Sequence, residues 1–353
     1  NPSLSEYDFY IGSDCIGQYD FRIHKRSDAS TITSAQKLFK EGDYLLVRRS
    51  LYGSDFRERA PRADFDGVCS ADILTIREKK GVIADGFLIY VLYQKSLWDF
   101  IVSNSNGGLT RRIKWKQLAD YEFDLPPIEE QRILADKLWA AYRLKESYKK
   151  LLTATQEMVK SQFIEMFGNP VANNKGWSTM ALKQVAPEEP SRERQTGTVW
   201  ILNLDMIESH TGKIIDKVYD EDTNLLSVAP FDEGNVLYSK LRPYLNKVVI
   251  PKGKGYATTE LVPLRPNQEY LNLTFFSHLL RGDDFVTYAN TISSGTKMPR
   301  MPLNDLRNFQ CILPPMEEQL KFEKVAEQAD KSEFELRKSI EAIDQVIKSL
   351  INN

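Results

Sequence analysis

The chain has 353 residues, of which 42% are hydrophobic and 27% are charged. This length exceeds what one hydrophobic core usually supports, so we expect at least two domains in an ordinary soluble protein. The formal net charge of −2 excludes a uniformly basic nucleic-acid binder, although it leaves room for local basic patches.

The region before residue 126 is expected to be a mixed sheet with short helices. Alternating apolar and β-branched residues predict strands at 44–47 and 68–76. The apolar run 87–92 predicts a short helix that packs on the sheet, and Gly107-Gly108 marks a turn.

A long helix is predicted next, from 126 to about 167. Pro126-Pro127 and two glutamates suit the first turn of a helix, and Gly168-Asn169-Pro170 suits its end. Apolar residues recur every three or four positions between these signals. We interpret the lysines on this helix as a solvated face, namely Lys145, Lys149 and Lys150.

The second half of the chain repeats this order. Residues 236–238 read as a strand, 273–280 as a short helix, and Ser293-Ser294-Gly295 as a turn. A second long apolar stripe begins at 314 and continues toward the end of the sequence.

The two halves are an internal duplication. The segment 125–131 (LPPIEEQ) recurs at 313–319 (LPPMEEQ), which is an offset of 188 residues. At the same offset Gly67 matches Gly255, and further matched pairs keep this register without a gap: Arg77 with Arg265, Phe87 with Phe275, Gly107 with Gly295 and Arg112 with Arg300. A short motif alone could recur by chance, but a gapless register of this length is much harder to explain in that way.

These observations predict an α+β protein with four segments. We expect globular domains at 1–125 and 169–313, and spacer helices at 126–168 and 314–353. Because an apolar stripe of roughly 40 residues is too long for one small domain to cover, we expect the two helices to pair as a coiled coil. The alternative is that each helix folds back on its own domain.

The pattern resembles the specificity (S) subunits of type I restriction–modification systems. The features that carry this resemblance are the duplication, the helix opening LPPxEEQ, the stop Phe167-Gly168-Asn169-Pro170, and two further segments, 256–261 (YATTEL) and 293–297 (SSGTK). The resemblance covers essentially the whole chain and implies two target-recognition domains that read the halves of a split DNA sequence. It also implies that the two helices form an antiparallel coiled coil, which sets the gap between the halves.

The same resemblance implies partners and the absence of a catalytic centre in this chain. Double-stranded DNA and two methylation subunits would bind it, and restriction subunits could join them. S-adenosylmethionine would belong to the methylation subunits, and ATP with Mg²⁺ to the restriction subunits, so this chain would carry no cofactor. A coiled-coil interaction protein and a subunit of a related split-site methyltransferase or nuclease system remain alternatives.

DNA contacts are expected from basic residues in corresponding loops of the two halves, because Lys and Arg bind phosphates and read base edges. A glycine-containing turn would also let the backbone approach a phosphate closely. The predicted set is Arg48, Arg49, Arg57, Arg59, Arg62, Arg111, Arg112 and Lys114 in the first half, and Lys240, Arg242, Lys247, Lys252, Lys254, Ser294, Thr296, Lys297 and Arg300 in the second.

Enzyme motifs are weak or missing in this sequence. Asp66 or Asp72 with Glu78-Lys79-Lys80 satisfies a loose nuclease pattern, but the second half lacks it, and we expect Glu78 in a solvated turn. No phosphate-binding loop GxxxxGK[ST] occurs. The histidines have no zinc-ligand spacing, and His278 reads as a core residue; we therefore predict no metal site.

The cysteines and the lack of targeting segments predict the cellular location of the protein. Three widely separated cysteines, together with the lack of a signal peptide or transmembrane run, predict a cytoplasmic protein away from membranes.

The two halves differ at their start. The second half opens with residues 175–182, which look like the opening strand of the family, but the first half has no counterpart ahead of Phe9. We expect the first domain to lack this strand or to receive it from another segment.

Overall fold

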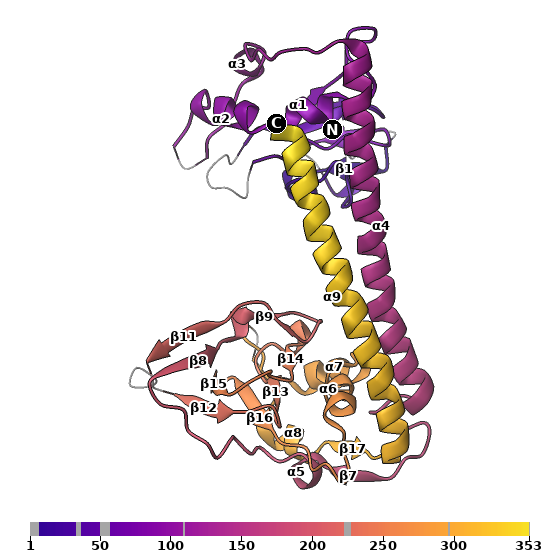
Figure 1. Ribbon diagram of the computed structural model, residues 1–353, viewed down its shortest axis with the longest axis vertical. Helices are drawn as coiled ribbons and strands as arrows, with labels where there is room; N and C mark the ends of the chain where they lie inside the picture. The colour runs from indigo at the N-terminus through magenta and orange to yellow at the C-terminus, as the bar shows by residue number, and fades with distance from the viewer. Residues whose placement is uncertain are drawn as a thin grey trace. The chain divides into compact units, whose positions relative to one another are not determined.

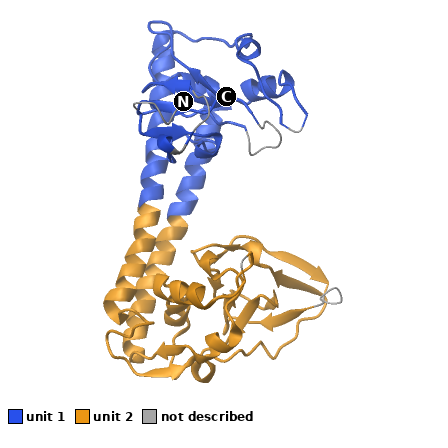
Figure 2. Ribbon diagram, turned by 180° about the vertical axis from the view of Figure 1, so that it is seen from behind, with its two compact units in different colours: residues 1–150, 336–353 blue, residues 151–335 orange. Residues whose placement is uncertain are grey.

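The computed structural model describes residues 7–32, 37–49, 57–108, 110–221, 227–295 and 297–352. The chain divides into two compact units, which Figure 2 colours separately. Unit 1 comprises residues 1–150 and 336–353, and unit 2 comprises residues 151–335. Among the described residues, no helix combines the length and the hydrophobicity that a membrane span requires.

Unit 1 contains a small mixed sheet, a two-stranded sheet and short helices, of which Figure 1 labels β1 and α1 to α3. Its elements in chain order are β1 (Phe9–Ile11), β2 (Ser27–Asp28), β3 (Lys37–Phe39), β4 (Tyr44–Val47), β5 (Gly67–Cys69), β6 (Ile73–Ile76), α1 (Leu88–Leu92), α2 (Lys95–Ser103), α3 (Trp115–Leu118) and the start of α4 (Ile128–Phe167). The strand predicted at 68–76 is wrong as one element, because a turn at 70–72 divides it into β5 and β6.

Unit 2 contains the remaining strands and helices. They are β7 (Thr179–Ala181), α5 (Leu182–Val185), β8 (Thr198–Leu202), β9 (Ile207–Glu208), β10 (Lys213–Ile214), β11 (Val218–Glu221), β12 (Val228–Phe231), β13 (Val236–Ser239), β14 (Val248–Val249), β15 (Gly255–Thr258), β16 (Leu261–Leu264), α6 (Leu273–Arg281), α7 (Asp283–Ile292), α8 (Leu303–Asn308) and β17 (Gln310–Ile312). The unit also holds the end of α4, from 151, and the part of α9 (Met316–Asn352) up to 335. The predicted strand at 236–238 and the predicted helix at 273–280 are confirmed.

The two units share one strand topology. Unit 1 has the order β2-β1-β5-β3, and unit 2 has the order β11-β8-β15-β12. In each sheet the two central strands are parallel and the outer pairings are antiparallel. A separate antiparallel pair, β4 with β6 and β13 with β16, also recurs. The duplication read from the sequence is therefore present in the fold.

Matched residues occupy matched positions in these sheets. Gly67 pairs with Phe39 in unit 1, and Gly255 pairs with Phe231 in unit 2. A Cβ at either glycine would lie 2.8 Å from the phenylalanine ring. The close contact between glycine backbone and aromatic ring explains why both halves keep glycine at this point.

The glutamine that ends LPPxEEQ fastens the start of each long helix to its own unit. Gln131 Oε1 accepts a hydrogen bond from Ala84 N at 2.9 Å, and its amide nitrogen donates to Val82 O and Pro126 O. Gln319 accepts from Asn272 N at 2.8 Å and donates to Tyr270 O and Pro314 O. Both side chains are buried, so the motif is structural in both repeats.

The two long helices lie against each other in an antiparallel sense within each unit. In unit 1, Lys145 of α4 pairs with Asp344 of α9, while Ile347 and Ile351 join the same hydrophobic core as Leu138. In unit 2, the rings of Phe163 and Phe322 meet at 5.3 Å. Gln156 there donates to Glu333 at 3.2 Å. The pairing predicted for the helices is confirmed in both units.

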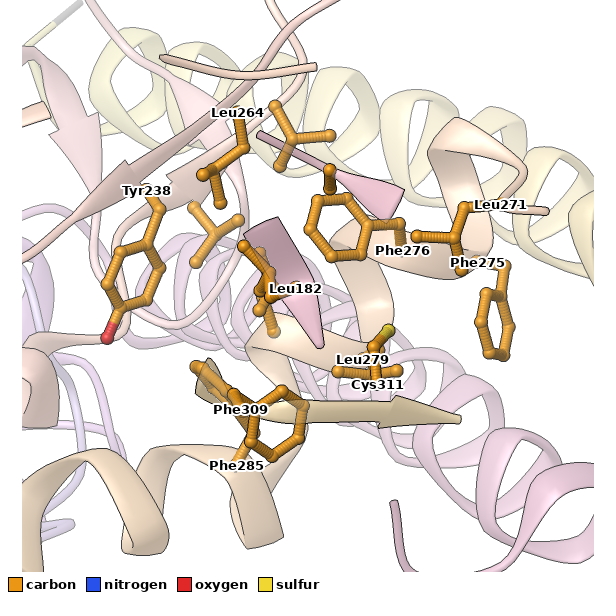
Figure 3. Close-up of a cluster of buried hydrophobic side chains, with 14 of the residues drawn as sticks. Leu182, Tyr238, Leu264, Leu271, Phe275, Phe276, Leu279, Phe285, Phe309 and Cys311 are labelled. Atoms are coloured by element: carbon orange, nitrogen blue, oxygen red, sulfur yellow. The ribbon is translucent and has the colours of Figure 1, made fainter. Parts of the chain in front are cut away.

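The largest core of unit 2 joins the helices to the globular region (Figure 3). Phe285 of α7 and Phe309 meet edge to face with ring centroids 4.9 Å apart. Phe167, where α4 ends, contacts Phe275 of α6 at 4.7 Å. Because these rings come from separate segments, burial of their apolar area holds the helices to the sheet.

Candidate nucleic-acid interface

The end of strand β4 meets a hairpin loop in unit 1, and this contact brings two predicted basic clusters together. Arg49 and Arg112 form an isolated antiparallel bridge, and Arg112 bridges in turn to Asn106. Ile113 N donates to Arg48 O at 3.1 Å. Residues that are far apart in the sequence therefore form one basic site.

Unit 2 builds the same site from the matched residues. Leu241 bridges to Arg300, and Arg300 bridges to Ser294. Met301 N donates to Lys240 O at 2.9 Å, and Arg242 N donates to Pro299 O at 2.7 Å. We name these two surfaces the hairpin sites: Arg48, Arg49, Arg111, Arg112 and Lys114 in unit 1, and Lys240, Arg242, Ser294, Lys297 and Arg300 in unit 2.

In each hairpin site, an acidic residue at a matched position forms an ion pair with the matched arginine. In unit 1, Asp72 pairs with Arg112 and also accepts from Arg49 at 2.8 Å. In unit 2, Glu260 accepts three hydrogen bonds from Arg300, at 2.9, 3.1 and 3.3 Å. Asp72 and Glu260 are separated by the repeat offset of 188. The acid fixes the guanidinium, and nearly half of each arginine side chain stays exposed.

Several cations in the hairpin sites have their charge available. Lys297 and Lys114 are exposed, and no described residue forms an ion pair with either of them. Lys240 is half-buried, with no ion pair to the described residues. The Nε atoms of Arg48 and Arg242 are enclosed and have no hydrogen-bond partner among the described residues. The exposed lysines can take an anionic partner without breaking an ion pair to a described residue.

Matched glycines shape the two hairpins. Gly107 has a φ of +126° and Gly295 a φ of +103°, a backbone conformation that L-residues with a side chain rarely adopt. Thr296, a predicted contact, lies outside the described residues. Ser294, Gly295 and Lys297 are exposed, and the small side chains of the first two let a phosphate approach the backbone.

Comparison with known proteins was made for sequence and for structure. No family model matches the sequence. A curated relative, the type I restriction enzyme EcoDI specificity subunit of Escherichia coli, is 23% identical over 294 residues, which is 71% of this chain. The aligned part spans 65% of that relative's length.

Solved structures give the same fold. A chain from a type I restriction–modification system aligns over 98% of this chain and 90% of its own length, with a TM-score of 0.57 and 18% identity. The S subunit of a type I restriction–modification system from M. genitalium aligns over 99% and 88%, with a TM-score of 0.51 and 13% identity.

The sequence is similar to a type I specificity subunit, and the fold is similar to solved chains of type I systems. The duplication and the helix pairing in each unit agree with this similarity. The resemblance read from the sequence is confirmed, together with the α+β architecture of two repeated globular regions and two long helices.

Three arginines that were predicted to bind DNA lie outside the hairpin site of unit 1, namely Arg57, Arg59 and Arg62. Arg59 is buried, and it donates to Ile16 O at 2.8 Å and to Ser13 O. Arg62 pairs with Asp85 and lies 3.9 Å from Glu78, and Arg57 donates to Asp99 at 3.2 Å. Arg59 is therefore a structural residue, in contrast to the DNA contact that the sequence predicted. The charges of the other two are largely paired within unit 1.

The remaining basic residues of unit 2 surround strands β14 and β15. Lys247 donates to Leu204 O at 2.6 Å, and burial lowers the pKa of its amine. Lys254 pairs with Glu193, whereas Lys252 is exposed. In unit 1, Arg111 donates weakly to Val102 O at 3.4 Å. Of these four, Lys252 has the charge that is most accessible to a partner.

The residues of the nuclease pattern do not assemble into a site in the described part of the chain. Glu78 accepts from Tyr44 Oη at 2.7 Å and from the backbone N of Leu88 at 3.2 Å. Its side chain is 11% exposed, so the solvated turn predicted for it is wrong. Asp72 is occupied by the two arginines of the hairpin site. The two carboxylates therefore have separate structural roles.

One polar cluster was missed because its members are distant in the sequence. His24 Nε2 lies 2.9 Å from Tyr142 Oη, 3.5 Å from Glu146 and 3.9 Å from Asp20. Asp20, His24 and Glu146 could each offer one metal ligand. Lys149 already lies 3.0 Å from Glu146, so the carboxylate charge is balanced within the protein. We interpret the cluster as a link between the 20–24 loop and α4.

His278 behaves as the sequence predicted. Its ring packs edge-on against Phe322 at 5.1 Å, and its Nε2 lies 2.7 Å from Arg281 Nη2. Burial, followed by the charge of Arg281, holds the pKa of His278 well below its usual value. Both residues line a cavity of about 250 Å³ in unit 2, together with Asp330 and Glu333 of α9.

Proposed function

We propose that this chain is the DNA sequence-recognition subunit of a type I restriction–modification enzyme. Each unit would read one half of a bipartite target through its hairpin site. The observation that carries the proposal is the repetition of that site: a strand end, a glycine hairpin and an arginine held by an acid occur at matched positions in both units. Solvated surface charge alone gives no reason for such repetition.

Affinity and specificity would come from different members of a hairpin site. Exposed lysines such as Lys114 and Lys297 suit phosphates, because a compact ammonium needs no fixed geometry. Arg112 and Arg300 suit base edges, since each guanidinium is oriented by its acid and offers a planar pair of donors to guanine. The chain would therefore position DNA and read it without a catalytic centre of its own.

We further propose that the long helices dock two methylation subunits. On α4, Leu144, Leu151 and Met158 follow one another at seven-residue intervals and are about half exposed, between 46% and 51%. Exposed Phe334 adds an apolar residue on α9, at 65%. Apolar residues at seven-residue spacing fit the side of another helix. Methyl transfer from S-adenosylmethionine would then occur on the docked subunits, and ATP with Mg²⁺ would serve a restriction subunit.

Genome-wide mapping of adenine methylation tests this function. Cells that express this chain with its neighbouring methyltransferase are compared with cells that lack this chain. A split motif with a fixed gap that disappears without the chain supports the proposal and names both half-sites. If methylation is the same in both strains, the chain is not the reader.

The rival function is a coiled-coil interaction protein that does not bind DNA. It accounts for the paired helices and the apolar residues on α4, but not for the two hairpin sites. Binding to random-sequence duplex DNA at low salt, with the methylation subunit present, separates the two. Because phosphate contacts dominate non-specific affinity, a DNA reader binds under these conditions and loses affinity as salt rises.

A further inference from the structure

A leucine takes the place of an arginine in the hairpin site of unit 2. In unit 1, Arg49 at the end of β4 bridges to Arg112 of the hairpin. In unit 2, the bridge at the same place joins Leu241 to Arg300. The acid of unit 1 therefore pairs with two guanidinium groups, whereas the matched acid of unit 2 pairs with one. The site of unit 2 has an apolar side chain where unit 1 has a second cation.

The hairpin itself differs in the same direction. At the repeat offset of 188 residues, Met298 matches Thr110, and Pro299 matches Arg111. Met298 is 45% exposed. A single exposed apolar residue is common on protein surfaces and needs no explanation. In this site, however, three matched positions are polar in unit 1 and apolar in unit 2, which indicates that unit 2 meets an apolar group of its partner.

The backbone of the hairpin holds the methionine and the matched threonine in the same place. A Cβ at Gly107 would lie 2.6 Å from the carbonyl oxygen of Thr110, and a Cβ at Gly295 would lie 3.2 Å from that of Met298. Each carbonyl thus packs on the glycine of its hairpin, while the side chain of the same residue is exposed. The two hairpins therefore present different side chains from one shared backbone arrangement.

Met298 is two residues from the arginine that suits a base edge. Glu260 accepts from Nε and Nη2 of Arg300, and no described residue accepts from its Nη1, so that edge can bind a guanine. Pro299 favours an extended backbone at the residue before it. In an extended segment, residues two apart point to the same side at a spacing of about 6.6 Å. Since stacked bases repeat at about 3.4 Å, Met298 meets a base within about two pairs of that guanine.

We infer that Met298 reads the C5-methyl group of a thymine in the half-site of unit 2. The inference rests on the proposed function and names one chemical feature of the target. Thymine carries a methyl group in the major groove, and apolar side chains contact it there. Arg300 binds a guanine within two base pairs of this thymine. Unit 1 has arginines at two of the three matched positions, and these suit guanine and phosphate instead.

The test uses the full chain in complex with its methylation subunit and a duplex that contains the mapped target. Deoxyuridine replaces one thymine of the target at a time, which removes a methyl group and keeps the base pair. Competition binding at fixed salt compares each duplex with the unmodified target. We expect one position at which the replacement lowers affinity about fourfold, the effect of one methyl group that is no longer buried.

Variants of Met298 show whether this side chain reads the methyl group. Met298→Gln keeps the length of the side chain but makes its end polar, and we expect it to bind the thymine and deoxyuridine duplexes equally well at that position. Met298→Leu stays apolar and should keep a difference between them. Val171→Ala, at an exposed apolar residue after the end of α4, is the control and should keep the full difference.

The outcomes separate this inference from the proposed function. If the wild-type complex binds the target no better than a scrambled duplex, the proposed function fails and the inference fails with it. If the target is bound but no thymine shows a difference that depends on Met298, only the inference is overturned. The same holds if Met298→Gln weakens binding to the thymine and deoxyuridine duplexes equally, because the side chain then acts as a wedge between bases and reads no methyl group.

Discussion

Lys145 of α4 and Asp344 of α9 form an ion pair in unit 1, with 2.6 Å between Nζ and the carboxylate oxygen. The lysine side chain is only 8% exposed, and the aspartate side chain is 33% exposed. The sequence predicted that Lys145 lies on a solvated helix face, and that prediction is wrong. The pair instead fixes which part of α9 lies beside this part of α4.

Breaking the pair should destabilise unit 1. Lys145→Ala leaves Asp344 without its partner in a partly buried position, and we expect a loss of about 1–3 kcal/mol in the free energy of unfolding. Hydrogen exchange of α4 amides between 128 and 150 measures the loss. The exchanged pair Lys145→Asp with Asp344→Lys should recover part of it, and Lys150→Ala, on an exposed lysine of the same helix, serves as the control. Equal stability of Lys145→Ala and Lys150→Ala would contradict the assigned role.

The glutamines of the repeated motif carry the second prediction. Gln131→Ala removes three hydrogen bonds and leaves Ala84 N, Val82 O and Pro126 O without their partner. Each buried unsatisfied group costs about 1–3 kcal/mol, so the start of α4 should loosen strongly. Gln319→Ala should have the same effect on α9.

Hydrogen exchange of the backbone amides in the first turns of α4 and α9 measures the effect of each variant on its own helix. Glu129→Gln, on the exposed face of the motif, is the control and should leave exchange unchanged. If the glutamine variants exchange like wild type, LPPxEEQ is a helix-start sequence and has no fastening role.

The sequence was informative where a pattern repeats and less so where a partner is distant. Matched pairs such as Gly67 with Gly255 and Gln131 with Gln319 could be found because one register relates them. The long helices and their pairing followed from apolar spacing alone. By contrast, the burial of Lys145, Glu78 and Arg59 is decided by partners more than 30 residues away, which no local pattern specifies.

The sequence predicted most of the basic residues that form the candidate site, but it did not predict how they are arranged. Two basic clusters, at 48–49 and 111–114, join through the bridge between Arg49 and Arg112. The acids that hold the arginines, Asp72 and Glu260, were outside the predicted set. Asp72 and Glu260 match at the repeat offset of 188. An acid conserved between the two repeats, beside basic loops that also match, indicates an ion pair that both units form.

Lys297 carries the third prediction, which concerns DNA binding. Lys297→Ala should weaken binding to the half-site read by unit 2 and reduce the slope of log affinity against log salt by about one, because one phosphate contact is lost. Titration of the chain with its methylation subunit against the target duplex at several salt concentrations measures both. Lys324→Ala, an exposed lysine on α9, is the control. An unchanged half-site affinity and salt slope would remove Lys297 from the interface.

His278 gives unit 2 a defined dependence on pH, the fourth prediction. Its pKa is held well below the ordinary value of 6.5 by burial and by Arg281. As pH falls below about 6.5, the unfolded chain takes up a proton that the folded chain does not. The free energy of unfolding should therefore fall, by at most about 1.4 kcal/mol per pH unit, until the folded-state pKa is reached.

The variant His278→Gln isolates this contribution. Glutamine keeps a hydrogen-bond acceptor for Arg281 but has no titration in this range, while Asp330 and Glu333, which line the same cavity, are present in both proteins. Hydrogen exchange of α6 amides between pH 7 and 5 gives the stability of each. We expect the wild type to lose stability more steeply than the variant on acidification. Parallel pH profiles would show that His278 becomes protonated in the folded state as readily as in the unfolded chain, and that its enclosure against Phe322 does not control its charge.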